Sequence, residues 1–543
     1  MDSPLPPRAR CDVLIVGAGA SGGVAAKELS SAGFTVVCLE QGDWTPSSAF
    51  TGDTPEWELS RGKTWHPNPN VRMAPADYPI NTSESDINPV MFNGVGGSTI
   101  LWAAGWGRAL PSDFRVRTLD GVADDWPFTY RDLAPWYERV EKDMGVSGLA
   151  GNPAYPEGLS YPLPPLPIGK VGMKAAQGMD ALGWHWWPGT NAITSKIYRH
   201  RPACLRYGTC MTGCPAGAKA STDLTHWPDA IADGARLVTG ARVREVTIDK
   251  RGRASGATYV DREGVEHHQH ADVVILAANG VGTPRLLLMS TSSTHPDGLS
   301  NSSGLVGRNL MIHPCASVTG TYDEDLESWY GPAGQALESM EFYETDVSRG
   351  FVRGSKWDAS PSGGPLGVYE DQAEDSVPDL AWGQELQKQV RTEVGRSFVW
   401  GMVAEDLPDL ANTISLDLEL KDSDGIPAPK VTYTVPDNTR RILDFNLERA
   451  REAHEAAGAV TTKTSRLLRD GGWHLMGTAR MGTDPAASVV DEWGRCHDVP
   501  NLYIIDGSVF VTSSGINPTA TIMAIALRSI DHLIQNRRFQ GTP

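Results

Sequence analysis

The stretch 11–42, CDVLIVGAGASGGVAAKELSSAGFTVVCLEQG, decides the fold. It begins with a short apolar run, passes three glycines in G-x-G-x-x-G spacing, and continues into a helix-like segment that Gly33 can end. A second apolar run follows and stops at Glu40. This order of strand, glycine turn, helix, strand and terminal acid predicts a βαβ unit that binds a dinucleotide at the carboxyl edge of a parallel sheet.

Each part of this unit has a physical role in dinucleotide binding. Gly17 allows a tight turn, Gly19 lets backbone N–H groups approach a pyrophosphate, and Gly22 lets helix and strand pack closely. The helix N-terminus presents unpaired N–H groups to the phosphate charge, and the acid can accept a hydrogen bond from a ribose 2′-hydroxyl group. We therefore expect cofactor contacts here from Gly17, Gly19, Ala20, Ser21, Gly22, Glu40 and Gln41.

Length and composition limit the possible functions. A chain of 543 residues is long enough for two large lobes, and 40% hydrophobic with 21% charged residues is typical of a globular protein. The net charge of −18 argues against nucleic acid and anionic membrane as partners. No run approaches the ~20 apolar residues of a membrane span, and the first ten residues lack the apolar core of a secretion signal. We expect a cytoplasmic protein.

The pattern of the first unit returns later in the chain. Strands are predicted at 243–248 and 272–278, and Thr283-Pro284 is expected to open an apolar helix over 285–289. A strand over 502–505 would bring Asp506 and Gly507 to the same sheet edge. Helices are predicted over 130–144, ended by Gly145, and over 519–535.

A different region lies between these parts. Residues 398–403, 413–420 and 431–435 alternate as antiparallel strands, and 438–457 is an amphipathic helix. The preceding segment, to about residue 395, is acidic and rich in Gly, Pro and Ser, and we expect it to cover the site. The fold class is therefore α/β: a doubly wound Rossmann-type domain (1–60, 90–110, 215–316 and 470–543) with a discontinuous α+β substrate domain built on an antiparallel sheet (61–89, 111–214 and 317–469).

Three cysteines, Cys204, Cys210 and Cys214, lie close together in the sequence. One interpretation is a metal or iron–sulfur site, but a fourth ligand is missing and no nearby histidine completes a zinc set. The other is a structural loop with free thiols or one local disulfide. The second interpretation is favoured, and no metal site is predicted.

Two residues near the C-terminus can carry chemistry. His474 can accept the proton of an alcohol near neutral pH, and Asn517, like His474, is flanked by glycine and small residues. The alternatives are a buried core histidine and an N-cap asparagine, with Pro518 at the first helical position.

The assembled motifs resemble the glucose–methanol–choline (GMC) oxidoreductase family over nearly the whole chain. The matching pieces are the glycine turn with its acid, the stretch 94–99, the stretch 280–290, and His474 with Asn517-Pro518-Thr519. The resemblance implies bound FAD, a proton taken by His474, a hydride passed to flavin N5, and an oxygen positioned by Asn517. It implies further cofactor contacts from Gly96, Gly97, Ser98, Val243, Ala278, Asp506, Gly507, Asn517, Pro518 and Thr519.

Within this family the chain is most similar to pyranose oxidases and to bacterial glycoside 3-oxidases. The resemblance implies oxidation of a secondary ring hydroxyl (C3 or C2) of a sugar or glycoside, with O₂ or a quinone as electron acceptor. Fungal pyranose oxidases hold their flavin through a histidine where this chain has Leu101, so the FAD is expected to be non-covalent. The alternatives are a flavoprotein subunit of a sugar dehydrogenase, which passes electrons to a partner, and a lyase that retains the flavin.

Overall fold

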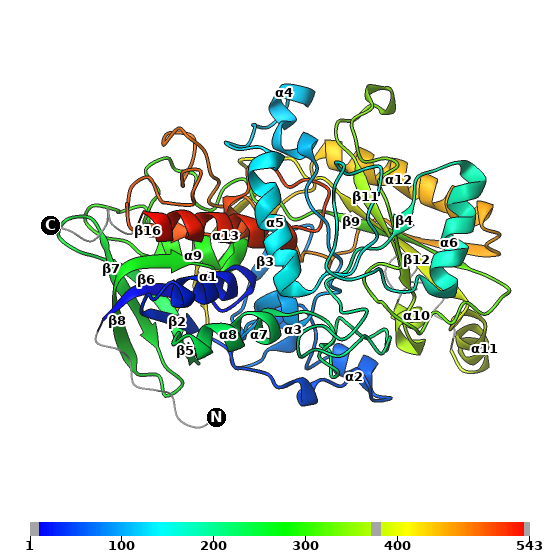
Figure 1. The fold of residues 1–543 in the computed structure, drawn as a ribbon, viewed down its shortest axis with the longest axis horizontal. Helices are drawn as coiled ribbons and strands as arrows, with labels where there is room; N and C mark the ends of the chain where they lie inside the picture. Colours follow the sequence, from blue (N-terminus) through cyan, green and yellow to red (C-terminus); the bar gives the residue numbers. More distant parts are fainter. Residues whose placement is uncertain (1–9, 371–381, 537–543) are drawn as a thin grey trace.

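The computed structural model describes residues 10–370 and 382–536. Two groups of elements lie side by side in it (Figure 1). One is built on a seven-stranded sheet and the other on a six-stranded sheet. Within the described residues no helix is long and apolar enough to cross a bilayer.

The seven-stranded sheet contains the predicted βαβ unit. Strands β5, β2, β1, β8 and β16 run parallel, and β8 begins earlier as part of an antiparallel β6-β7-β8 meander. The order is β5-β2-β1-β8-β7-β6, with β16 beside the second half of β8. The fold class predicted from the sequence is confirmed. The bounds are β1 (Cys11–Val16), β2 (Val36–Glu40), β5 (Arg236–Thr239), β6 (Arg242–Ile248), β7 (Ala254–Val260), β8 (Glu266–Leu276) and β16 (Leu502–Ile504).

Close backbone approach explains two of the glycines in the first turn. Gly17 has φ +102°, and a Cβ there would lie 2.5 Å from the carbonyl oxygen of Ala277 on the neighbouring strand connection. A Cβ on Gly22 would lie 2.0 Å from the carbonyl oxygen of Gly17. The turn therefore closes only without side chains at these two positions.

Helices cover this sheet, and Figure 1 shows α1 and α13 next to each other with α5 crossing them. Helix α5 begins with a capping box between Thr129 and Asp132 and ends at left-handed Gly145, as the sequence predicts. The helices of this part are α1 (Ala20–Ser31), α5 (Tyr130–Met144), α7 (Thr222–Thr225), α8 (Trp227–Ala232), α9 (Asn279–Met289) and α13 (Thr519–Gln535).

One helix begins earlier than expected. The prediction that Pro284 opens a helix is wrong, because α9 starts at Asn279 and holds Pro284 inside it. The Asn279 side chain accepts hydrogen bonds from two backbone N–H groups of the first turn, which starts the helix. Pro284 cannot donate to the carbonyl of Gly280, and the hydroxyl of Thr478 donates to it instead at 2.8 Å.

The six-stranded sheet has the order β15-β9-β12-β11-β10-β4. Two of its strands, β10 and β11, lie in the acidic segment for which the sequence analysis predicted a covering role but no strands. Part of that segment, 371–381, lies outside the described residues. The bounds are β4 (Trp187–Pro188), β9 (Cys315–Thr321), β10 (Leu337–Ser339), β11 (Ser355–Pro361), β12 (Ser397–Ala404) and β15 (Thr461–Ser465).

The two faces of this sheet differ in polarity. One face is apolar and packs with Trp357, Trp400 and Met402 against helices α6 (Gly169–Leu182) and α12 (Asp437–Ala456). Because successive side chains of a strand point to opposite faces, the residues between them face the other way, toward the seven-stranded sheet. This second face carries polar and charged side chains, which are described below.

A third, three-stranded sheet has the order β13-β14-β3. Short helices lie in the connections between the larger elements. The remaining bounds are β3 (Asn81–Ser85), β13 (Thr413–Lys421), β14 (Pro427–Tyr433), α2 (Trp57–Arg61), α3 (Pro69–Arg72), α4 (Val116–Asp120), α10 (Pro365–Glu370), α11 (Gln384–Glu393), η1 (Ser47–Ala49), η2 (Gly97–Ile100), η3 (Pro111–Phe114), η4 (Val347–Arg349) and η5 (Gly507–Val509).

Candidate active site

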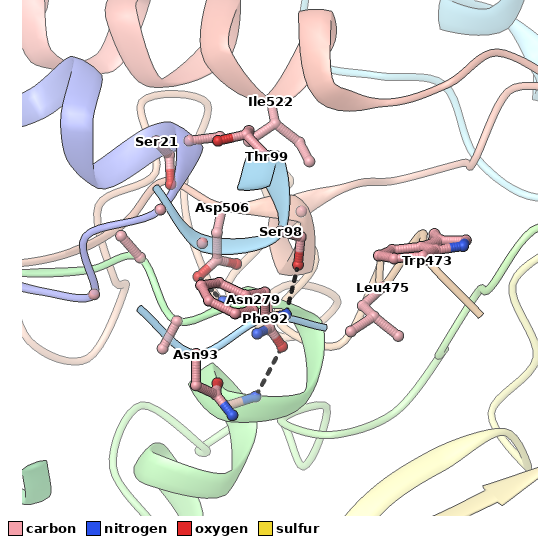
Figure 2. Close-up of a pocket in the computed structure, with 18 of the residues that line it drawn as sticks. Ser21, Phe92, Asn93, Ser98, Thr99, Asn279, Trp473, Leu475, Asp506 and Ile522 are labelled. Carbon is pink, nitrogen blue, oxygen red and sulfur yellow. Dashed lines mark hydrogen bonds between the residues drawn. The ribbon is translucent and has the colours of Figure 1, made fainter. Parts of the chain in front are cut away.

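A long cavity starts at the glycine turn after β1 and ends beneath the polar face of the six-stranded sheet. Figure 2 shows that segments far apart in the sequence line it, among them Ser21 of α1, Ser98, Asp506 and Trp473. Cys315 of β9 and Val403 of β12 lie at its sheet end. Its lining comes from 16–21, 39–41, 92–105, 211, 241–243, 277–289, 315, 403, 471–475 and 506–522.

The structure brings nearly all predicted site residues to this cavity. The residues that line it are Gly17, Gly19, Ala20, Ser21, Glu40, Gln41, Gly97, Ser98, Val243, Ala278, His474, Asp506, Gly507, Asn517, Pro518 and Thr519. Gly22 and Gly96 are outside the lining and support it. Gly22 packs against the turn, and Gly96, with φ +101°, donates its N–H to the carbonyl of Ala18 at 2.9 Å.

Glu40 ends β2 inside the cavity wall. Its two carboxylate oxygens accept hydrogen bonds from the N–H groups of Ala18 (2.8 Å) and Gly42 (2.9 Å). These bonds fix the carboxylate at the edge of the sheet, and burial raises its pKa above the ordinary value.

A second histidine, which the sequence did not single out, contacts His474. The Nδ1 atoms of His313 and His474 lie 2.9 Å apart. The Nε2 atom of His313 faces the carbonyl oxygens of Ser514 (2.5 Å) and Ser513 (3.1 Å). A carbonyl only accepts, so His313 Nε2 carries the hydrogen and His313 Nδ1 is an acceptor. His474 must then donate from Nδ1, which leaves its Nε2 as an unprotonated acceptor.

The surroundings of His474 keep the imidazole neutral. Burial lowers its pKa well below 6.5, and the neighbouring His313 and the positive charge of Lys356 lower it further. The base form is therefore the resting form at neutral pH. Burial also lowers the pKa of His313, to about 4, which keeps this ring neutral and in the tautomer that orients His474.

Asn517 is held by a buried lysine. Lys356 Nζ donates to Asn517 Oδ1 at 3.0 Å, and Gln335 Nε2 lies 3.4 Å from the same oxygen. An ammonium group cannot accept a hydrogen bond, so the amide oxygen must face Lys356 and the amide NH₂ must face away from it. Helix α13 starts at Thr519 and its N-terminus has no side-chain cap, so the Asn517 side chain does not serve as an N-cap.

A charged network supports the loop that carries Asn517. The N–H of Gly515 donates to the hydroxyl of Tyr343 (3.0 Å), and this hydroxyl donates to Asp113 (2.8 Å). Asp113 is paired with the buried Arg353, whose Nε also contacts Glu405 at 2.9 Å. The loop before α13 is thus tied to an internal cluster of charges.

The cysteine loop lies beside the cavity. Cys204, Cys210 and Cys214 are free thiols, and Met211 between them lines the cavity. The buried Lys219 donates to the carbonyl oxygens of Ile100 (2.7 Å), Trp102 (3.0 Å) and Cys210 (2.6 Å). This lysine fixes the cysteine loop to the cavity wall.

Sequence comparison identifies the family. Models of the GMC oxidoreductase family match residues 173–315 and 408–526, and a model of the NAD(P)-binding Rossmann-like domain matches residues 15–74. A 2-methyl-1,2-propanediol dehydrogenase of Mycolicibacterium austroafricanum is 41% identical over 536 residues, which are 97% of this chain and 95% of that protein. The chain belongs to the GMC oxidoreductase family. The predicted family and enzyme class are confirmed, and FAD is its cofactor.

Two further relatives of this GMC oxidoreductase share most of its length. The fructose dehydrogenase large subunit of Gluconobacter japonicus is 30% identical and covers 97% of this chain and 98% of its own. Paromamine 6′-oxidase of Streptomyces fradiae is 30% identical, with 95% and 90% covered. The crystal structure of pyridoxine 4-oxidase from Mesorbium loti has the same fold, with a TM-score of 0.65 at 18% identity over 96% of this chain and 99% of that chain.

The cavity walls fit FAD. No side chain caps the N-terminus of α1 or of α13, and both ends reach the cavity, so free N–H groups face it at two places. Helix N-termini attract negative charge. The N-terminus of α1 suits the pyrophosphate of FAD, and the N-terminus of α13 suits the negative charge of the reduced flavin ring. Between them, a Cβ on Gly97 would lie 2.8 Å from the Cα of Gly19, so two glycine segments form a narrow cradle that a side chain would fill.

Proposed function

We propose that this protein oxidises a secondary ring hydroxyl, at C3 or C2, of a sugar or glycoside to a ketone. The observation that carries the proposal is that His474 and Asn517 both line the FAD cavity, His474 hydrogen-bonded to His313 behind it and Asn517 held through its amide oxygen by Lys356. When bound, FAD supplies the acceptor for the hydride that leaves the alcohol carbon, and its electrons pass on to O₂ or a quinone.

Two residues of the chain act on the hydroxyl. His474 Nε2 accepts its proton, because the Nδ1–H of this ring is already donated to His313. The amide NH₂ of Asn517 donates to the same oxygen and so stabilises the negative charge that develops there. The alcohol loses two electrons and two protons, which matches reduction of O₂ to H₂O₂ or of a quinone to a quinol.

The polar face of the six-stranded sheet supports a polyhydroxylated substrate. Lys356, Asp358 and Glu338 lie on this face, on strands β11 and β10, and each has a hydrogen-bond partner in the protein. A wall of such polar groups suits a substrate rich in hydroxyl groups better than an apolar one. Relatives named for fructose and paromamine oxidation agree with a sugar-like substrate. We assign the substrate-binding role to the part of the chain built on this sheet.

Product analysis tests the proposal. We expect incubation with a methyl glycoside and an electron acceptor to yield a keto-glycoside whose carbonyl carbon, found by NMR, is C3 or C2. An aldehyde at C6 as the product would contradict oxidation of a ring hydroxyl.

A second candidate is a flavoprotein subunit that passes its electrons to a partner. The match to a fructose dehydrogenase large subunit over nearly the whole chain favours it. Oxygen consumption separates the two candidates. An oxidase consumes one O₂ for each sugar oxidised, whereas a dehydrogenase subunit turns over only with a quinone or another added acceptor.

We propose that the FAD is held without a covalent bond. Leu101 occupies the position where fungal pyranose oxidases attach their flavin, and its buried side chain packs with Phe50, Trp65 and Ile100 and does not line the cavity. Acid precipitation of the purified protein is expected to release all of its FAD into the supernatant. Yellow colour that stays with the precipitated polypeptide would contradict this.

A further inference from the structure

We infer that the pair Lys356–Asp358 binds a second hydroxyl on the carbon next to the reacting one, so that the substrate is a vicinal diol. This inference rests on the proposed function, because it places the reacting hydroxyl at His474 and Asn517. It adds a binding site for the neighbouring oxygen, built from two residues of β11.

The strand register places this pair on the face of the sheet that is turned to the cavity. Lys356 pairs with Val403 of β12, and Val403 pairs with Cys315 of β9. Directly paired residues of neighbouring strands share one face of a sheet. Val403 and Cys315 line the cavity, so Lys356 lies on the same face. Asp358, two residues further along, also lies on this face.

Space for a ligand atom lies beside the pair. Asp358 is directly opposite Gly401 of β12, and a Cβ built on this glycine meets nothing closer than 3.8 Å. The side chain of Asp358 remains 13% exposed, whereas the side chain of Lys356 is fully buried. The glycine leaves room at the point where the carboxylate reaches the open side.

The free hydrogen-bonding groups match a hydroxyl. Among the described residues, Lys356 Nζ contacts two acceptors, Asp358 Oδ1 at 2.6 Å and Asn517 Oδ1 at 3.0 Å. An ammonium has three N–H donors, so one remains for a ligand. Asp358 Oδ2 has no donor within the described part of the chain, and it remains as an acceptor. A hydroxyl both donates and accepts, so it can use both groups at once.

The position of Lys356 next to Asn517 indicates which carbon of the substrate carries the second hydroxyl. Lys356 Nζ lies 3.0 Å from Asn517 Oδ1, and the NH₂ of the same amide is proposed to bind the reacting oxygen. The free N–H of Lys356 and the Asn517 amide therefore lie close enough to bind two neighbouring hydroxyls of one ring. A hydrogen in place of the second hydroxyl would leave one N–H of Lys356 and one oxygen of Asp358 unpaired.

Matched ring alcohols test the inference. We expect the wild type to prefer trans-1,2-cyclohexanediol over cyclohexanol by roughly 10–10²-fold in kcat/KM, the range for hydrogen bonds to charged groups. In Lys356→Met the preference for the diol over cyclohexanol is expected to fall to about threefold or less, because the donor is gone. Asp358→Asn, which keeps the side-chain shape, is expected to lower the same ratio.

A binding measurement separates this inference from the proposed function. Dithionite-reduced holoenzyme cannot oxidise an alcohol, so calorimetry gives the Kd of each compound without turnover. The wild type is expected to bind the diol at least about tenfold more tightly than cyclohexanol, and Lys356→Met is expected to lose this difference. If no alcohol is oxidised but this binding difference holds, the proposed function fails and the diol site stands.

The control is Lys463→Met. Lys463 lies on β15 of the same sheet but does not line the cavity, and its ammonium group donates to Glu393 at 2.6 Å. This variant should keep the wild-type ratio. A diol preference that is absent in the wild type, or that survives in both Lys356→Met and Asp358→Asn, would overturn the inference.

Discussion

Replacing His474 with alanine is expected to lower the rate of flavin reduction by an alcohol substrate roughly 10²–10⁴-fold, which is the usual contribution of a general base. The residue lines the cavity at its sheet end, and its free Nε2 is the acceptor that the tautomer of His313 leaves open. FAD binding should persist, because the glycine cradle and both helix N-termini are unchanged. Anaerobic stopped-flow absorbance measures both quantities.

A companion variant separates proton transfer from ring orientation. His313→Leu keeps the base but removes the group that fixes its tautomer, and a misplaced group can cost up to about 10²-fold. Its rate should therefore lie between those of the wild type and His474→Ala. A wild-type rate in His474→Ala would remove this residue from the reaction.

The pH profile gives a second readout of the same base. Only the unprotonated imidazole accepts a proton, and its pKa is lowered well below 6.5, so the acid limb of kcat/KM is expected below pH 6.5. Lys356→Met removes a positive charge that disfavours the imidazolium, and the limb should move to higher pH. A limb that does not move would show that another group controls it.

Replacing Arg353 with methionine is expected to give the largest loss of stability. Its buried guanidinium contacts Asp113 and Glu405, which are buried too, and Asp120 at 3.3 Å. Removing one partner of a buried charge network typically costs about 3–5 kcal/mol, because the remaining charges lose their compensation. The variant should also reduce flavin slowly, since Asp113 positions Tyr343 and the loop of Gly515.

The loss should depend on pH in a defined direction. Burial raises the pKa of Asp113 to about 7 and also raises that of Glu405. Without the arginine both values rise further, so the folded state binds more protons than the unfolded state and stability falls as pH rises. We expect the midpoint of urea unfolding to fall further below that of the wild type at pH 8 than at pH 6 in the Arg353→Met variant.

Arg466→Met serves as the control for that measurement, since its ion pair with Asp444 is exposed on both sides. It is expected to change stability by no more than about 0.5 kcal/mol. An Arg353→Met protein as stable as this control at both pH values would contradict the account of the charge network.

Local signals in the sequence predicted much of the fold. The βαβ unit, α5 with its Gly145 end, and α13 were predicted because caps, glycine turns and apolar periodicity act over a few residues. The same signals located His474 and Asn517, each beside small residues. They failed at α9, where a side-chain cap from Asn279 and a distant donor, Thr478, outweigh the usual preference of proline for a first turn.

The site residues that the sequence analysis did not predict are placed by contacts between distant segments of the chain. His313 lies in the connection before β9 and Lys356 lies within β11, and no short pattern in the sequence marks either residue. Lys356 gains its role only because β11 pairs with β12 and reaches Asn517, 161 residues further along the chain. Strand register and such long-range pairs are set by tertiary packing, which periodicity in one segment does not contain.

The most direct test of this account is anaerobic mixing of the purified yellow protein with a panel of sugars, glycosides and vicinal diols, followed by the flavin absorbance. The account predicts that ring sugars and diols bleach the flavin of the wild type at a rate that falls roughly 10²–10⁴-fold in His474→Ala. A flavin that no alcohol of the panel bleaches, or that bleaches equally fast in both proteins, would contradict it.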